Sequence, residues 1–216
     1  MHVCLQYQGK YFFMRRTKAE AEQTREDILN AAIDMFYKDG VSKTTLNGIA
    51  THAGVTRGAI YWHFKNKMEI FDGLHEKLHK PLSDHIMADM KIDHPHPIQQ
   101  LKELCVQLLV EFEENEQKRK ILTIFLRKCE YSGEFEECKA RYCDEKKESL
   151  GLFTKYFEKA QEKGAISKDA DPELLCQAVN CYMKGIIMEY LDYHDTFDMR
   201  AKAPALMDLL FKSIGK

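Results

Sequence analysis

The chain has 216 residues, of which 44% are hydrophobic, and this length and apolar fraction suffice for a packed core, which excludes a disordered protein. Only 5 prolines and 11 glycines accompany 10 methionines and 31% charged residues, a composition that favours helices over the turn-rich strands of a sandwich or barrel. The sequence therefore predicts an all-α protein.

No segment resembles a membrane span or a targeting peptide. The apolar runs are all shorter than the roughly eighteen residues that a span needs, and residues 1–13 lack the basic end and apolar stretch of a signal peptide. Seven cysteines form an odd set without CxxC pairs, which favours reduced thiols over a disulfide framework or a four-cysteine zinc site. We therefore expect a soluble cytoplasmic protein with no cofactor and no bound metal.

The net charge of −2 hides an uneven distribution of charged residues. Residues 40–67 contain no Asp or Glu but include Lys43, Arg57, Lys65 and Lys67. The rest of the chain to the C-terminus has 22 basic and 28 acidic residues, which gives −6. Because phosphate groups must meet positive charge and avoid carboxylates, a basic stretch inside an acidic protein predicts an anion-binding surface.

Capping residues and apolar residues at helical spacing predict nine helices along the chain. The first begins at the capping sequence of residues 24–27 and ends at Gly40, and a long fourth helix begins at a capping box that joins Asn66 to Glu69. Prolines mark the start of two later helices, because a proline is well tolerated at the first helical position. Four later helices are expected near residues 97–115, 118–131, 135–163 and 172–191, and a final helix holds Leu206, Leu209, Leu210 and Ile214.

Residues 45–64 have the pattern of two short helices joined by a turn. Thr44 or Thr45 can cap the first helix and Thr56 the second, while Gly54 makes the turn between them. A short helix, a glycine turn and a second short helix form a helix-turn-helix, whose second helix enters the major groove of DNA.

The second short helix carries side chains suited to DNA contact. The guanidinium fork of Arg57 matches the O6 and N7 acceptors of guanine, and Gly58 removes a side chain where backbone and DNA come close. Ile60 and Phe64 are expected in the core instead. The residues that offer hydroxyl, ring N–H or ammonium donors to the sugar-phosphate chain are Thr45, Tyr61, Trp62, His63 and Lys67.

Three stretches of the chain resemble a known family. The run TLNGIATHAGVTRGAIYWHF at residues 45–64, with the KNK that follows it, resembles the DNA-binding signature of the TetR family. Residues 14–25 (MRRTKAEAEQTR) resemble the start of AcrR-type repressors of multidrug efflux pumps, and residues 127–134 (RKCEYSGE) are similar to a stretch of the same repressors. The likeness is strong from about residue 22 to residue 82 and weaker through most of the rest.

The resemblance implies a homodimer of nine- or ten-helix subunits that binds an operator and is released from it by a small molecule. By position, Arg57 would read bases, Thr56 and Gly58 would lie against them, and Thr45, Tyr61, Trp62, His63 and Lys67 would hold phosphates. The implied division is an arm at residues 1–21, a DNA-binding domain at 22–82 with its helix-turn-helix at 45–64, and a ligand-binding and dimerisation domain at 83–216. The last two helices are the expected dimer face.

The ligand site has no sharp motif. Residues 97–197 hold 12 of the 23 aromatic residues, together with methionines that adapt to varied shapes. The resemblance to AcrR-type repressors implies a roomy pocket of aromatics with a buried acid, which accepts cationic or amphipathic drugs. The residues assigned to this pocket are His79, Phe112, Phe125, Glu130, Tyr156 and Tyr182.

His75-Glu-Lys-Leu-His79 matches HExxH, a pattern in which two histidines bind zinc and the glutamate activates water. Pro81 follows almost at once, and no HxxGxxH extension supplies a third ligand. We therefore rank a zinc peptidase below a metal- or pH-sensing role for these histidines, and both below ordinary solvated helix residues.

Cysteines five residues apart suggest thiol-based redox sensing as an alternative for the inducer. The two pairs are Cys138 with Cys143 and Cys176 with Cys181. Five residues on a helix correspond to about 140 degrees, which points the members of a pair away from a common ligand. Buried, unreactive thiols are therefore the favoured interpretation.

The sequence as a whole predicts a ligand-responsive transcriptional repressor of a multidrug efflux operon, without catalytic activity. The alternatives are a redox- or metal-responsive regulator of the same fold, a constitutive DNA-binding protein with a filled C-terminal core, and a zinc peptidase. Residues 1–13 precede the region of resemblance and come either from an upstream start codon or from a genuine extension. If they are a genuine extension, a basic arm that adds phosphate contacts is predicted from Lys10, Arg15, Arg16 and Lys18.

Overall fold

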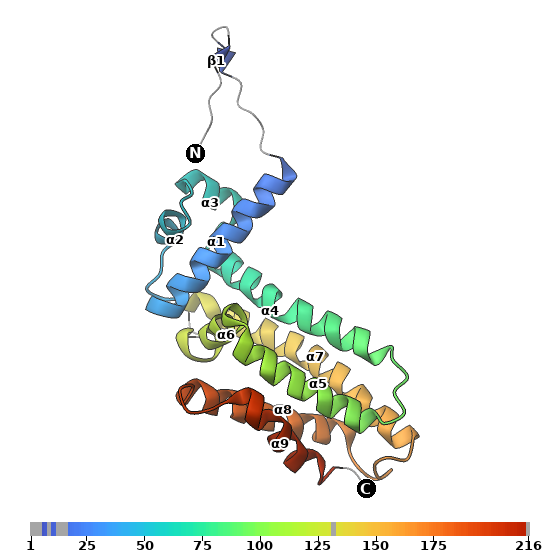
Figure 1. Ribbon diagram of the computed structural model, residues 1–216. Coiled ribbons are helices and arrows are strands. Elements are labelled where there is room, and N and C mark those ends of the chain that lie inside the picture. Colours follow the sequence, from blue (N-terminus) through green and yellow to red (C-terminus); the bar gives the residue numbers. More distant parts are fainter. Residues whose placement is uncertain (1–5, 8–9, 12–16, 131–132, 215–216) are drawn as a thin grey trace.

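The computed structural model describes residues 6–7, 10–11, 17–130 and 133–214, and some side chains between residues 134 and 148 lie outside that description. The described residues confirm an all-α fold (Figure 1). The α-helices are α1 (Lys18–Asp39), α2 (Leu46–His52), α3 (Arg57–His63), α4 (Lys67–Met90), α5 (Pro97–Glu114), α6 (Glu116–Thr123), α7 (Glu136–Glu162), α8 (Pro172–Asp192) and α9 (Met199–Phe211). A short antiparallel pair, β1 (Gln6–Tyr7) and β2 (Lys10–Tyr11), precedes them.

Helix α1 begins earlier than the capping sequence at residues 24–27 predicts. Thr17 and Glu20 form a capping box in which the Thr17 hydroxyl accepts from the Glu20 N–H and the Glu20 carboxylate accepts from the Thr17 N–H. Thr24 is a buried residue inside the helix, and its hydroxyl donates to the Glu20 carbonyl. The prediction of the start was wrong because two threonines can cap, and the earlier one has a glutamate three residues later.

The predicted helix-turn-helix is present as α2 and α3. The Thr45 hydroxyl accepts from the Gly48 N–H at 3.1 Å, and the Thr56 hydroxyl accepts from the Ala59 N–H at 3.2 Å. Gly54 adopts a φ of 66° in the turn, a conformation that residues with a side chain rarely adopt. Thr45 rather than Thr44 is therefore the cap of α2.

Helices α1 to α4 enclose the first of two hydrophobic cores. Phe36 of α1, Ile49 of α2, Ile60 of α3 and Phe71 of α4 are each fully buried there. The α6 region adds Ile121 and its neighbours to the same core. Residues from the second half of the chain therefore pack in the same core as the helix-turn-helix.

The segment after α6 differs from the predicted single helix of residues 118–131. Helix α6 ends at Thr123, and the π-helix η1 (Ile124–Lys128) follows it; a 3₁₀ turn η2 (Gly133–Phe135) leads into α7. The carbonyl of Lys128 accepts from the Val41 N–H at 3.2 Å, which joins η1 to the connection between α1 and α2. Side-chain spacing does not distinguish a π-helix from an α-helix over so short a run.

The second core lies among α5, α7, α8 and α9, with the far end of α4 beside it. Figure 1 shows α4 leading from the α1–α3 group along α7 and α5, while α8 and α9 form the opposite side of the molecule. Helix α9 begins at Met199, where Asp198 caps it, and it contains Leu206, Leu209 and Leu210 as predicted, whereas Ile214 lies beyond its end at Phe211. Within the described residues, no helix is both long and apolar enough to cross a membrane.

Candidate nucleic-acid interface and ligand cleft

Helix α3 presents polar and aromatic side chains to solvent while apolar residues attach it to the core. Ile60 is fully buried and Phe64 is 2% exposed, as the sequence predicts. On the other side, Trp62 is 73% exposed and Tyr61 is 43% exposed, although aromatic rings of this size are commonly covered. An exposed aromatic pair in an acid-free stretch is a surface suited to nucleic acid.

Arg57 lies at the first turn of α3 and is exposed, with its guanidinium carbon 5.6 Å from the centre of the Tyr61 ring. This cation–π contact orients the guanidinium without consuming its N–H donors. A β-carbon built on Gly58 would meet nothing within 4 Å, so the space beside Arg57 is open. The start of α3 thus has the accessibility that a base-reading helix requires.

Thr45 and Thr56 are exposed residues whose side-chain oxygens act as helix caps. Each hydroxyl still has its own hydrogen to donate, because the capping bond uses only an oxygen lone pair. A phosphate beside either helix start would also meet the backbone N–H groups and the positive end of the helix dipole. Capping and phosphate contact are therefore compatible at both positions.

Two of the predicted phosphate-binding residues have internal contacts. The Lys67 ammonium donates to the carbonyls of Val41 at 3.2 Å and Ser42 at 3.4 Å, and it lies 5.9 Å from the centre of the Phe135 ring. The His63 ring packs edge-on against Trp62, with centroids 4.4 Å apart. Lys67 therefore holds the connection between α1 and α2 in place, directly behind the interface.

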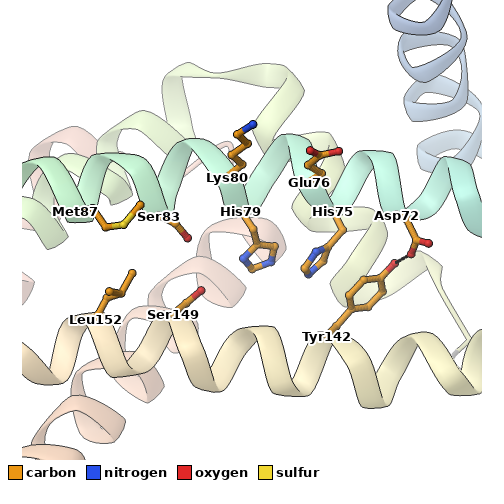
Figure 2. A pocket seen from close by; sticks show the side chains of 10 residues that line it. All are labelled: Asp72, His75, Glu76, His79, Lys80, Ser83, Met87, Tyr142, Ser149 and Leu152. Carbon is orange, nitrogen blue, oxygen red and sulfur yellow. Dashed lines mark hydrogen bonds between the residues drawn. The ribbon is translucent and has the colours of Figure 1, made fainter.

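A cleft of about 610 Å³ lies between α4 and α7. Figure 2 shows His75 and His79 projecting from α4 toward α7, with Ser149 and Leu152 on the facing side. The lining residues on α4 include Asp72, His75, His79 and Ser83, which recur every three or four positions along one stripe. The volume is in the range that small-molecule sites occupy.

Aromatic stacking and one strong hydrogen bond order the α1-proximal end of this cleft. The His75 ring stacks on His79 on one side and on Tyr142 on the other, each pair with centroids 3.9 Å apart. The Tyr142 hydroxyl donates to the Asp72 carboxylate at 2.6 Å (Figure 2). Burial lowers the pKa of the His79 imidazole, and its Nδ1 atom is buried with no hydrogen-bond partner among the described residues.

The structure separates the six residues that the sequence assigns to the ligand pocket. His79 lines the cleft, and Phe125 lies beside it in an edge-on contact with His75 at 5.5 Å. Phe112 and Tyr156 are buried in the second core, where the Tyr156 hydroxyl donates to Asp89 at 2.5 Å.

The last two of the six also lie outside the cleft lining. Tyr182 is half-buried on α8, and Glu130 is exposed after η1. The residues predicted for the ligand pocket do not include Asp72, Ser83 or Ser149, which line the cleft. The stripe on α4 that contains HExxH could have identified Asp72 and Ser83.

The HExxH glutamate and histidines point in different directions. In Figure 2, Glu76 and Lys80 project from the side of α4 away from α7, whereas both imidazoles project into the cleft. Glu76 is therefore poorly placed to activate a water held between the imidazoles, which argues against the zinc-peptidase interpretation.

The cysteine pair on α8 has the geometry that its spacing predicts. Cys176 is 3% exposed, and Cys181 is exposed on another side of the helix. The side chains of Cys138 and Cys143, like those of Lys10, Arg15 and Arg16, lie outside the described residues.

Two family descriptions match the chain. Residues 28–74 match "Bacterial regulatory proteins, tetR family", and residues 96–215, more than half of the chain, match "MAATS-type transcriptional repressor, C-terminal region". The first match contains α2 and α3, and the second contains the whole of the second core apart from its α4 contribution. The chain therefore belongs to the TetR family and is a DNA-binding transcriptional regulator, not an enzyme.

Individual relatives match over nearly the whole chain. The HTH-type transcriptional repressor BepR of Brucella suis biovar 1 (strain 1330) is 33% identical over 201 residues, which are 93% of this chain and 96% of BepR. The crystal structure of NalD, the secondary repressor of the MexAB-OprM multidrug efflux pump in Pseudomonas aeruginosa, superposes with a TM-score of 0.80 at 30% identity, covering 91% of this chain and 98% of NalD. The complex of SmeT with triclosan gives a TM-score of 0.81 at 27% identity, covering 90% and 92%.

Proposed function

We propose that this protein represses a multidrug efflux operon and leaves its operator when a small amphipathic or cationic molecule binds. The observation that carries the proposal is the exposed, acid-free surface of α3, on which Arg57 is accessible while Ile60 and Phe64 attach the helix to the core. NalD and SmeT, which share the fold, are repressors of efflux pumps, and SmeT has been solved with the small molecule triclosan.

In this proposal Arg57 contacts base edges, Thr56 and Gly58 lie against them, and phosphates are held by Thr45, Tyr61, Trp62 and His63. Lys67 joins the phosphate contacts only if its ammonium leaves the carbonyls of Val41 and Ser42. While it donates to these carbonyls, the Lys67 ammonium positions the α1–α2 connection.

The proposed division of the chain follows the two cores. Residues 22–82 form the DNA-binding domain, to which the first turn of α1 at residues 18–21 also belongs, and residues 83–216 form the ligand-binding and dimerisation domain. Two copies assemble through α8 and α9, where Leu174 is 62% exposed and Leu209 is 66% exposed. A two-fold dimer offers two reading helices to two half-sites.

We place the inducer in the cleft between α4 and α7. Asp72 supplies a carboxylate, Tyr142 and the two imidazoles supply aromatic faces, and Leu152 supplies an apolar wall. This combination suits an amphipathic molecule with an aromatic or cationic group. Helix α4 also begins beside α3, so a ligand that shifts α4 changes the placement of the reading helix.

The test measures binding of the full chain to DNA from upstream of its own gene and of neighbouring transporter genes, in a salt series. We expect salt-sensitive, sequence-selective binding, and Arg57→Ala should lose about 1–3 kcal/mol of discrimination between operator and altered sites. Lys168→Ala, in the exposed connection between α7 and α8, is the matched control and should bind as the wild type does. Absence of selective binding at low salt would contradict the repressor assignment.

The inducer site is tested in the same assay with a panel of cationic drugs. Ser149→Trp places an indole in the cleft and should abolish release by any drug that releases the wild type, while operator affinity without drug stays unchanged. Release that persists in Ser149→Trp would show that the inducer binds elsewhere.

A further inference from the structure

A second cavity, of about 530 Å³, is lined by residues from the end of α1, the α6–η1 segment and the end of α8. We call it the junction cleft. It is separate from the cleft between α4 and α7, with which it shares no lining residue. Its charged and aromatic lining residues include Tyr37, Lys38, Arg119, Arg127, Lys128 and His194.

The lining of the junction cleft is basic in a protein whose net charge is −2. Among the described residues that line it there are two lysines, two arginines and a histidine but no carboxylate. Asp192 neutralises one of these charges, since it pairs with Arg127 at 2.8 Å. Within the described part of the chain, Lys38 and Lys128 form no ion pair, so their charges stay uncompensated.

The two guanidinium groups are held in place by backbone carbonyls. Arg127 donates to the carbonyls of Met188 and Leu191 at 3.3 Å, which places it against the C-terminal end of α8. Arg119 donates to the Glu113 carbonyl at 2.5 Å. Arginines fixed in this way lose little conformational freedom when they bind an anion, and their planar forks suit phosphate oxygens.

We infer that the junction cleft binds an aromatic phosphate of nucleotide size. The phosphate would lie among Lys38, Lys128 and Arg119, whose combined charge no carboxylate of the lining offsets. The aromatic part would lie against Tyr37, a residue that is 41% exposed and whose ring centre is 5.9 Å from the Lys120 ammonium. A molecule of this kind fits the volume, whereas an inorganic anion would leave most of it empty.

Binding there has a structural route to the helix-turn-helix. Lys128 ends η1, and its carbonyl accepts the Val41 N–H just after Gly40, which has a φ of 85°. The same connection receives the Lys67 ammonium from α4. An anion that draws Lys38 and Lys128 together therefore favours one placement of α1 relative to η1 and α8. This regulatory effect rests on the proposed function, whereas the binding itself does not.

The experiment is isothermal titration calorimetry of the full chain, without DNA, using adenosine monophosphate, adenosine and inorganic phosphate as probes. We expect saturable binding of adenosine monophosphate that weakens with salt, and at least about tenfold weaker binding of each of the other two probes. The double variant Lys38→Glu/Lys128→Glu should weaken adenosine monophosphate binding at least tenfold, while Lys168→Glu, an exposed lysine outside the cleft, should leave it unchanged.

Either of two titration results would overturn the inference. One is that adenosine monophosphate does not bind, and the other is that it binds equally well to the double variant. Thermal unfolding of the double variant checks that it is folded, and operator binding by the wild type tests the proposed function independently.

Discussion

At the scale of single residues, the burial of His79 makes the stability of the fold depend on pH. Burial lowers the pKa of its imidazole below the ordinary value of 6.5, so the unfolded chain takes up a proton first as the pH falls. The free energy of unfolding contributed by neutral His79 is fully present above pH 6.5 and decreases as the pH falls toward its folded-state pKa.

Between about pH 7 and pH 5, we expect the free energy of unfolding of the His79→Gln variant to decrease less than that of the wild type. Urea unfolding at each pH measures this. His96→Gln, at an exposed histidine, is the control and should behave as the wild type. If His79→Gln and wild type showed parallel pH dependence, burial of His79 would not be the cause.

The cysteines permit a second residue-scale prediction, which bears on the redox-responsive alternative. Burial raises the pKa of the Cys105 thiol to about 12, and burial also raises that of Cys176. Since the thiolate is the reactive form, both should resist alkylation in the native protein, whereas exposed Cys181 should react. Mass spectrometry of alkylated peptides measures this, and rapid modification of Cys105 in the folded chain would support redox sensing instead.

At the scale of elements, helix α4 contributes side chains to both cores, and its first turn is capped by Asn66. The Asn66 side chain accepts from the Glu69 N–H at 2.9 Å, and the Glu69 carboxylate accepts from the Lys65 N–H at 2.8 Å. The predicted capping box is thus only half right, since Glu69 reaches the N–H before the cap.

We expect Asn66→Ala to reduce the free energy of unfolding by about 1 kcal/mol, because the orphan N–H loses its acceptor. Asn66→Asp keeps an acceptor oxygen at the same place and should retain most of the stability. Equilibrium unfolding in urea compares the three proteins, and an equal loss in both variants would assign the effect to something other than capping.

At the scale of the whole molecule, the proposed dimer interface rests on the exposed apolar residues of α8 and α9. A monomer gains nothing from leaving Leu209 two-thirds exposed beside exposed Ala205 and Ala201 at helical spacing. We expect Leu209→Glu to weaken self-association by at least about tenfold, because it places a charge in an apolar contact.

Sedimentation velocity over a concentration series measures the effect of Leu209→Glu. The matched control is Ile92→Glu, at a residue that is 57% exposed in the connection between α4 and α5. A wild-type protein that sediments as a monomer, or equal weakening by both variants, would contradict an α8–α9 interface.

Interactions between residues close in sequence determine most of the helix boundaries, and such interactions can be predicted from the sequence. The acid-free run of residues 40–67 and the caps at Thr45, Thr56 and Asn66 involve residues within a few positions of one another. So does the exposure of Trp62, which lies two positions after buried Ile60 and therefore on the opposite face of α3, while Arg57 is exposed at the first turn of the helix. The all-α class and the helix-turn-helix were therefore determined by the sequence alone.

The ligand-side residues depended on tertiary structure, because helix phase does not say which buried side chains face a filled core and which face a cleft. Phe112 and Tyr156 belong to the core, while Asp72 and Tyr142, seventy positions apart, meet in one hydrogen bond. The basic junction cleft likewise arises where three distant segments pack together. Short-range rules in the sequence determined the surface that is proposed to contact DNA, and only the packing of distant helices formed the clefts that are proposed to bind small molecules.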